Sequence, residues 1–315
     1  MARNGKEKAP SSGAASPAHL RRHEWVAVLG AAARSRRGAI GALLALSVVA
    51  VAVIGPFVAP HSSTEFVTSA FTGPSGRSLL GSDGLGRDVL SRVLFGGWLL
   101  LLMAAVATAL GAIIGTALGI TAAYFRGTFD GLIMRAVDIF LAFPQIVFAL
   151  LLLSVAGPKL WLVVIAVGIS HVPQVARVIR SASLDICEKD YVKAVELLRI
   201  KPRKIIVGDI LPNLVTPLMV EVGLRFTWSI VIIAGLSFIG FGLQPPAPNW
   251  GLMLNENRIG LVSNPWAVVV PAVLVAVLTV GTNTFTDAIA RVSIGVERPV
   301  GDEVFLGVAT LETEK

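Results

Sequence analysis

The chain has 315 residues, of which 54% are hydrophobic and only 15% are charged, and its formal net charge is +7. A soluble domain carries about 25% charged residues, so this composition excludes an ordinary soluble enzyme and favours a membrane protein with several spans. The single cysteine, Cys187, excludes an internal disulfide.

Residues 1–37 are rich in alanine, serine, proline, lysine and arginine, a composition typical of a disordered basic tail. The apolar run that follows, 38–59, is too long for the hydrophobic region of a signal peptide, and no clear small-residue cleavage site comes after it. We therefore interpret residues 38–96 as an uncleaved first membrane span and an external loop.

Six apolar runs follow one another along the chain, and roughly 20 helical residues cross a bilayer core of about 30 Å. Helices are the expected form because lipid offers backbone groups no hydrogen-bond partners. The sequence thus predicts an all-α membrane protein with six transmembrane helices, five of them in a core at residues 97–291, before a cytoplasmic tail at 292–315. The runs are 38–59, 97–125, 139–156, 160–178, 214–242 and 266–290.

Lysine and arginine are distributed unevenly between alternate segments. Of the 27 such residues, 21 lie in segments 1–37, 126–138, 177–213 and 291–315, five lie in the intervening segments, and Arg225 lies within a span. Positive residues gather on the cytoplasmic side of a membrane. This asymmetry predicts that both termini are cytoplasmic, and it explains most of the net charge without a nucleic-acid partner.

The external stretch at 81–92, GSDGLGRDVLSR, has the glycine spacing of a phosphate-binding loop. Such a loop needs a lysine and then a serine or threonine, and here those positions hold Arg87 and Asp88. No strand precedes the stretch, and the charge pattern places it outside. We therefore exclude ATP binding and expect a tight turn at Gly81, Gly84 and Gly86, followed by a short helix that begins at Asp88.

The second span carries small residues every four positions, so they share one helix face and permit close approach of another helix. Packing inside the bundle is the favoured interpretation, and contact with a second membrane subunit is the alternative. The residues are Ala107, Gly111, Gly115, Gly119 and Ala123.

Two prolines, Pro144 and Pro173, predict kinks in the third and fourth spans. His171 is isolated in sequence, which favours a hydrogen-bonded structural histidine over a proton relay. Four histidines and one cysteine form no ligand-spaced metal cluster. Ser237 lies in GLSFIG rather than in a nucleophile motif, so we predict neither a metal site nor a catalytic residue.

The longest loop between spans, 180–213, contains a short apolar stripe within a charged surround. It fits a short amphipathic helix that ends before Pro202. This helix either packs on its own bundle or docks on a partner.

The fifth span contains Glu221 and Arg225, four residues apart and so able to pair on one helix face. Charges inside a membrane are costly and mark pathways by default. The pair is therefore a candidate for lining or gating a translocation path, and a structural ion pair is the alternative. Beyond this span, Pro245, Pro246 and Pro248 preclude a regular helix, and Trp250 and Trp266 suit a membrane interface.

Three motifs occur in order along the six spans: LLGSDGLGRDVLSRVLFGG, DYVKAV with a later KIIVGDILPN, and LSFIGFGLQPPAPNWGLML. Together they resemble the C-type permease subunit of dipeptide and oligopeptide ATP-binding-cassette (ABC) importers, from about residue 38 to residue 291. The resemblance implies the type I ABC importer permease fold, with a cytoplasmic coupling helix that sits in a groove on an ATPase subunit.

The coupling motif of that family reads approximately E-A-A-x-x-x-G, followed by I-L-P-N. Here Lys193 replaces the acidic residue and Arg199 replaces the glycine, while Leu-Pro-Asn remains at 211–213. Because arginine does not readily adopt the left-handed backbone open to glycine, we expect either an unstrained turn or a loop that is built differently. The resemblance implies ATPase-coupling contacts from Tyr191, Lys193, Ala194, Val195, Glu196, Leu197, Leu198, Arg199, Ile200, Lys201 and Pro202.

The resemblance further implies a non-catalytic, multi-pass subunit of the bacterial plasma (inner) membrane. Its partners are a B-type permease, two ABC ATPase subunits or domains that hold ATP and Mg, and an external binding protein that delivers di- or oligopeptides. No cofactor is expected in this chain. Two alternatives stay open: the same importer type for nickel, haem or another small solute, and an ion-driven secondary transporter that uses Glu221 and His171.

Overall fold

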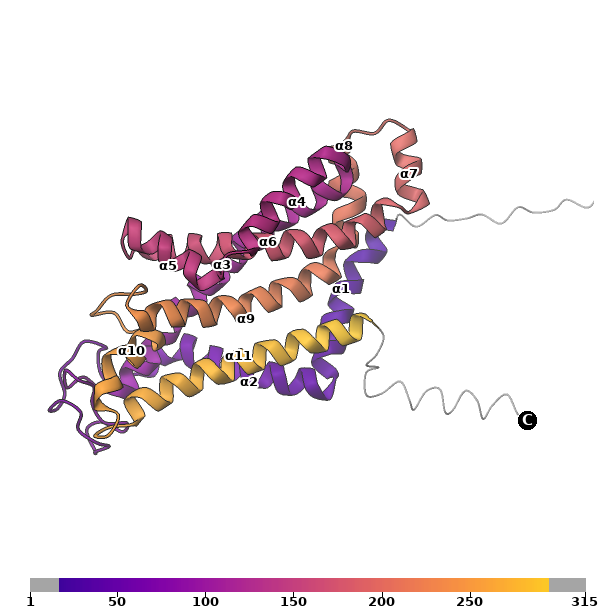
Figure 1. The fold of residues 1–315 in the computed structure, drawn as a ribbon. Helices are drawn as coiled ribbons and strands as arrows, with labels where there is room; N and C mark the ends of the chain where they lie inside the picture. Colours follow the sequence, from indigo (N-terminus) through magenta and orange to yellow (C-terminus); the bar gives the residue numbers. More distant parts are fainter. Residues whose placement is uncertain (1–16, 295–315) are drawn as a thin grey trace, which may run out of the picture.

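The structure is a computed structural model, which describes residues 17–294 and the side chains from residue 26 onward. Figure 1 shows an elongated helical bundle in which α3, α6 and α9 run side by side, with α2 and α11 along one flank. The helices are α1 (Pro17–Arg34), α2 (Arg36–Val58), α3 (Val89–Phe125), α4 (Gly127–Leu141), α5 (Gln145–Ala156), α6 (Leu160–Cys187), α7 (Asp190–Leu197), α8 (Pro202–Ile205), η1 (Ile206–Ile210), η2 (Leu211–Asn213), α9 (Val215–Ile239), α10 (Trp250–Asn257), η3 (Arg258–Gly260) and α11 (Trp266–Ser293).

Five helices in the described part of the chain are long and apolar enough to cross a membrane, and a bent pair brings the number to six. The pair is α4 and α5, which meet at an angle of 82°. Pro144 caps α5 at this break, as proline cannot continue the hydrogen bonding of α4. The predicted all-α fold with six spans is therefore confirmed, with the third span broken into two helices.

Helix α3 is longer than the apolar run that predicted it. The short separate helix expected at Asp88 is wrong: the Asp88 side chain accepts a hydrogen bond from the Ser91 backbone and so caps one continuous helix of 37 residues. Helix α6 likewise extends to Cys187, beyond the predicted end at residue 178. Both helices thus project past the apolar part of their sequences.

Small residues bring α3 and α6 into direct backbone contact. A Cβ atom on Gly115 would lie 2.6 Å from the Cβ of Val175, and one on Gly119 would lie 2.6 Å from the Ala176 carbonyl oxygen. Real side chains do not approach so closely, so this contact requires glycine. The stripe predicted for the second span therefore packs inside the bundle, as favoured from the sequence.

Helix α1 occupies part of the segment predicted to be a disordered tail. It lies against α11 and α2, where Ala32 is buried with Ala288 and Ile289. This apolar contact gives residues 17–34 a packed surface that their average composition did not reveal. The remaining parts of the two predicted tails, 1–16 and 295–315, lie outside the described residues.

The ring of Trp250 is buried rather than placed at the membrane interface. It lies over Gly96 and Gly97, and its Nε1 donates a 2.9 Å hydrogen bond to the Val93 carbonyl. The interface prediction for Trp250 is wrong because the two glycines leave room for the indole against α3. Trp266 is half exposed at the start of α11.

Candidate functional site

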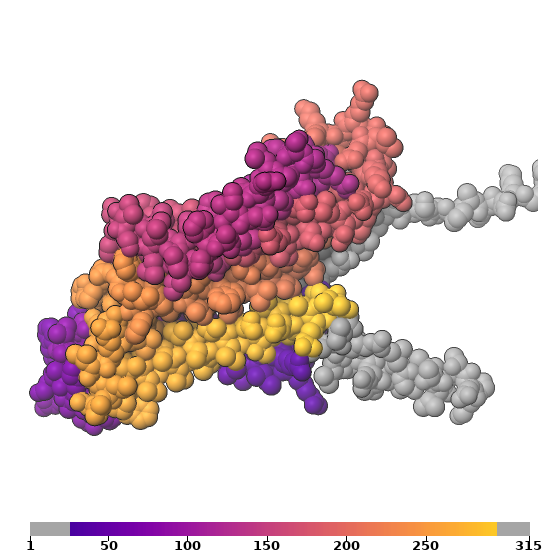
Figure 2. All heavy atoms as spheres, in the orientation of Figure 1, coloured from indigo at the N-terminus to yellow at the C-terminus, as the bar shows by residue number. Residues whose placement is uncertain are grey.

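The predicted amphipathic helix in the long loop is α7, which stands away from the bundle at the end opposite α10 (Figure 1). Val192 anchors it: this side chain is fully buried, and Val195 packs beside it against the end of α6. Leu197, by contrast, is 85% exposed, and Leu198 and Tyr191 also face outward. Figure 2 shows this segment protruding from the surface at that end of the molecule. The helix therefore presents apolar side chains that its own bundle does not cover.

The turn after α7 does take the left-handed backbone that glycine favours. Arg199 has φ +55°, and its backbone N–H donates to the Glu196 carbonyl at 2.9 Å. Left-handed backbone costs an L-residue about 1 kcal/mol or more. The expectation of an unstrained or differently built turn is therefore wrong: the chain keeps the turn and places arginine in it.

Asn213 links the foot of α9 to the coupling segment, which comprises residues 191–202. Its Nδ2 donates to the Tyr191 hydroxyl at 3.1 Å and to the Asp209 carbonyl. Pro202 begins α8, and the chain continues through η1 and η2 directly into α9. A displacement of α7 therefore reaches α9 through both a side-chain contact and the covalent chain.

Glu221 and Arg225 form the predicted pair on α9. Oε1 of Glu221 lies 2.8 Å from Nε of Arg225, and their side chains are only 5% and 13% exposed. The N–H does not point at this oxygen, so the contact is an ion pair rather than an aligned hydrogen bond. The two charges lie roughly 9 and 15 Å from the Val215 end of α9, at about 1.5 Å per residue.

His171 is fully buried and connects three helices. Its Nε2 lies 2.9 Å from the Ser229 hydroxyl on α9, which lies 3.0 Å from the Thr108 hydroxyl on α3. The hydrogen bond predicted for this histidine is thus confirmed, and Ser229 is its partner. This chain of polar contacts fixes the register of α3, α6 and α9.

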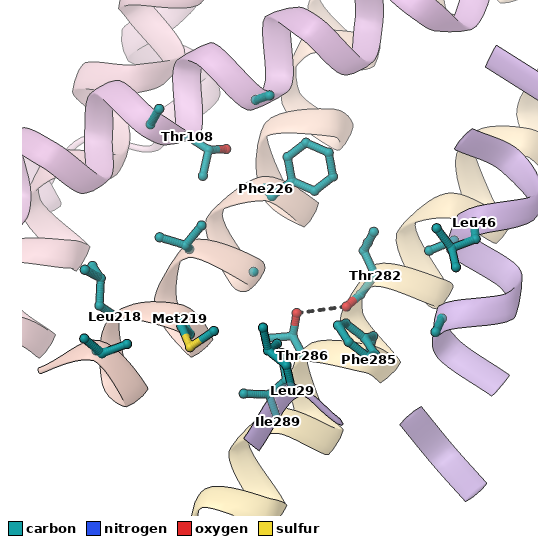
Figure 3. Close-up of a pocket in the computed structure, with 17 residues that line it drawn as sticks. Leu29, Leu46, Thr108, Leu218, Met219, Phe226, Thr282, Phe285, Thr286 and Ile289 are labelled. Atoms are coloured by element: carbon teal, nitrogen blue, oxygen red, sulfur yellow. Dashed lines mark hydrogen bonds between the residues drawn. The ribbon is translucent and has the colours of Figure 1, made fainter. Parts of the chain in front are cut away.

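An open cleft of about 690 Å³ is lined mainly by residues of α2, α3, α9 and α11 (Figure 3). Its walls are apolar apart from threonine hydroxyls, and two of these threonines bond within α11, where Thr286 donates to the Thr282 carbonyl at 2.9 Å. Neither Glu221 nor Arg225 lines it. A cleft of this kind suits apolar groups and offers no charged partner to a polar solute.

The stretch at 81–92 builds a buried ionic cluster at the opposite end of the molecule. Oδ2 of Asp83 accepts from Nε of Arg87 at 2.7 Å and from Nη1 of Arg92 at 2.6 Å. Nη2 of Arg92 then donates to Glu256 of α10 at 2.8 Å, and Arg87 reaches the same carboxylate at 3.3 Å. Sequence reasoning missed this cluster because 164 residues separate Arg92 from Glu256.

Gly81 and Gly86 shape the loop that carries the cluster. Both have positive φ, +73° and +81°, and a Cβ atom on Gly86 would lie 2.1 Å from the Thr68 carbonyl oxygen. The predicted tight turn is therefore confirmed. Burial raises the pKa of Glu256, the Arg87 guanidinium opposes that shift, and the Asp83 carboxylate adds to it. Asp83 and the two arginines are fully or almost fully buried. The ion pairs of these arginines with Glu256 therefore connect the interior of the loop to α10.

Residues 115–293 match the family described as the binding-protein-dependent transport system inner membrane component. This chain belongs to that family. The match covers the C-terminal end of α3 and everything from α4 to α11, and hence α7, His171 and the pair of Glu221 and Arg225. The chain is therefore a multi-pass membrane permease.

Several relatives align with most of the chain. A dipeptide transport system permease protein of Alkalihalophilus pseudofirmus is 33% identical over 257 residues, which are 81% of this chain and 84% of the relative. A putative peptide transport system permease protein of Brucella suis is 35% identical, covering 82% and 88%. A glutathione transport system permease protein of Escherichia coli is 34% identical, covering 81% and 85%.

A solved structure of the MetNI methionine ABC transporter in an inward-facing conformation supports the fold. It aligns with 66% of this chain and 97% of its own chain at a TM-score of 0.52 and 18% sequence identity. The chain thus has the permease fold of type I ABC importers, as the sequence motifs predicted.

We predict that Asp83→Asn destabilises the protein far more than Glu256→Gln. Removing the Asp83 charge leaves two buried guanidinium groups short of a partner, a change that costs about 3–5 kcal/mol in a buried pair. The side chain of Glu256 is 18% exposed, and burial raises its pKa, so removal of its charge costs less than removal of the fully buried Asp83 charge. Thermal unfolding of the detergent-purified protein measures both. Equal melting temperatures for the two variants would contradict the central position of Asp83.

The turn at Arg199 gives a second prediction. Arg199→Gly should raise the free energy of unfolding by about 1 kcal/mol because it removes the left-handed strain. Denaturant or thermal unfolding checks this, with Arg203→Gly as the control, since that residue lies in the first turn of α8 without positive φ. A lower melting temperature for Arg199→Gly would contradict this prediction. It would show that the arginine side chain stabilises the protein by more than its left-handed backbone destabilises it.

Proposed function

We propose that this chain is the C-type permease subunit of an ABC importer for di- and oligopeptides. The main observation in support is the structure of α7. Val192 anchors this helix, whereas Leu197 and Leu198 at its end are exposed. The hydrogen bond between Asn213 and Tyr191 lies beside them. An exposed apolar pair on a short, anchored helix fits a groove on a partner protein. The family of the chain supplies the partner class, since its members work in assemblies with ATPase subunits.

Peptides are the proposed cargo because the relatives described above are named for dipeptide, peptide and glutathione transport. These solutes share an amide backbone with charged groups. An external binding protein would select among them and deliver them to this chain and a second, B-type permease. The cluster of Asp83, Arg87, Arg92 and Glu256 holds the delivery end of the chain rigid.

ATP and Mg are assigned to two partner ATPase subunits, and this chain acts mechanically. The ATPases would move the coupling segment, Asn213 would pass that movement from Tyr191 to α9, and the bundle would change the side to which it opens. Both termini and α7 then face the cytoplasm, as the lysine and arginine asymmetry favours. No catalytic residue is assigned to the chain.

Glu221 and Arg225 are assigned a gating role on α9. Their burial and their absence from the lining of the cleft support a pair that holds one position of α9 rather than one that contacts solute. Along α9, the pair lies between the N-terminal end, which follows the coupling segment, and Ser229, which contacts His171. A movement of that N-terminal end would therefore reach the pair before it reaches Ser229.

We predict that Leu197→Asp uncouples the assembly, because a carboxylate replaces an apolar docking contact and must be desolvated there. The purified complex should lose ligand-stimulated ATP hydrolysis by at least tenfold and retain less ATPase subunit. Ile294→Asp is the control, since Ile294 is 78% exposed directly after α11 and lies outside the coupling segment. Unchanged ATPase retention and stimulation in Leu197→Asp would exclude α7 as the docking element.

We further predict that Glu221→Ala impairs both stability and import, since it leaves Arg225 buried without its counter-charge, at a cost of about 3–5 kcal/mol. The double variant with Arg225→Met should recover the melting temperature but not the import rate. Import into proteoliposomes and thermal unfolding separate these effects. Normal import by the double variant would make the pair structural only.

A further inference from the structure

One face of α6 is polar where the rest of the helix is apolar or covered. Gln174, Arg177, Ser181 and Asp185 recur at intervals of three and four residues, so they lie on one helix face. Arg177, Ser181 and Asp185 are exposed and Gln174 is partly exposed. We call these four residues the α6 polar stripe. Gln174 lies roughly 20 Å from the Cys187 end of α6, at about 1.5 Å per residue. Gln174 and Arg177 therefore lie within the apolar run at 160–178, near its end, and Ser181 and Asp185 lie beyond it.

Helix α4 adds a charge beside the stripe. Nη2 of Arg177 donates to the Asp138 carboxylate, and these side chains remain 57% and 61% exposed although they are paired. A second pair holds the two helices together: Arg180 donates from Nε and Nη2 to the two oxygens of Asp130, each at 2.5 Å. The pair of Arg177 and Asp138 is therefore exposed, and the pair of Arg180 and Asp130 holds α4 and α6 in fixed positions beside it.

The polar track continues at the break between α4 and α5. Nε2 of Gln145 donates to the Ser170 carbonyl at 3.1 Å. With the Gln174 amide turned so that its nitrogen faces that carbonyl, its oxygen accepts from Gln145 Nε2 at 2.7 Å. The two arms of this 82° bend, α4 and α5, both pack on α6, and Arg177, Ser181 and Asp185 stay exposed beside α4.

Lipid cannot be the neighbour of this face where it lies within the apolar run, at Gln174 and Arg177. Unsatisfied polar groups cost several kcal/mol each in hydrocarbon, and exposed charges cost more. Another face of α4 has the opposite character, with Leu132 and Ile139 exposed as lipid requires, and Phe143 in the break after α4 is exposed too. The two faces differ in kind, so only one of them can be turned to the bilayer.

We propose that the α6 polar stripe, with Asp138, forms one wall of the inner half of a water-filled path for the peptide. This inference rests on the proposed function. The charges of Asp138 and Arg177 match the ammonium and carboxylate termini of a peptide, and a second permease subunit closes the opposite wall. The apolar cleft between α9 and α11 offers such a cargo no charged contact, and Glu221 and Arg225 are too deeply buried to meet it.

Thiol labelling tests the wall in the complete importer. Cys187 is replaced by alanine, and single cysteines are introduced by Gln174→Cys and Ser181→Cys in the stripe. Ile139→Cys and Leu132→Cys on the apolar face of α4 are the controls, at roughly 18 and 8 Å from the Gly127 end by the same helical rise. Inside-out membrane vesicles are treated with a charged, membrane-impermeant thiosulfonate reagent.

We expect each stripe cysteine to react at least tenfold faster than its depth-matched control. Gln174→Cys reacting no faster than Ile139→Cys would overturn the proposal, because the stripe would then face lipid or closely packed protein. If Gln174→Cys does not assemble, Ser181→Cys against Leu132→Cys decides in the same way. Peptide uptake is measured separately, in the cysteine-free parent. If the stripe cysteines react but the parent takes up no peptide, the proposal of peptide as the cargo is wrong, and the proposal of a water-filled wall still holds.

The charge pair is tested separately by uptake. Arg177→Gln should lower the maximal rate of peptide uptake several-fold, whereas Arg126→Gln should not change it. Arg126 forms a comparable exposed pair with Glu188 at 3.5 Å, outside the stripe. Equal rates for Arg177→Gln and the wild-type complex would remove the pair from the path of the cargo.

Discussion

A bilayer offers polar groups nothing to bond with, and this constraint governs how the chain is built. Inside the bundle, buried polar side chains find partners on neighbouring helices, as Thr108, Ser229 and His171 do. Glycines in α3 then let its backbone approach α6 directly. The helices are held by close packing and a few matched polar contacts, which suits a bundle whose apolar surface gains little from burial in lipid.

The two ends of the molecule meet the constraint in different ways. At one end, Asp83 and two arginines bond to a carboxylate of α10, so a loop remote in sequence becomes a rigid cap. At the other end, α7 is fixed by Val192 and leaves Leu197 exposed among the residues that the structure describes. A rigid cap at one end and an uncovered apolar helix at the other agree with the proposal of a subunit that receives solute on one side and force on the other.

The sequence predicted what depends on local pattern. Apolar run lengths gave the number of spans, the spacing of small residues gave the packing face of α3, and motif order gave the family. It could not place Trp250, because the space for its ring is made by Gly96 and Gly97 on another helix. Nor could it find Glu256 as the partner of Arg92, since that pairing exists only once the loop folds onto α10.

At Arg199 the residue type differs from the family motif, but the backbone conformation does not. The residue departs from the family pattern, which suggested a different turn, yet its φ of +55° reproduces the conformation that glycine favours. The backbone path is set by the anchored α7 and by α8 after it, and the side chain adapts at modest cost. A substitution within a motif therefore does not by itself indicate that the backbone of the motif has changed.

The most direct test of the account is peptide uptake by the purified complex in proteoliposomes, with binding protein and peptide outside and the energy source varied. The account predicts uptake that requires ATP on the side of α7 and is unaffected when proton and sodium gradients are collapsed. Uptake driven by such a gradient without ATP would contradict it.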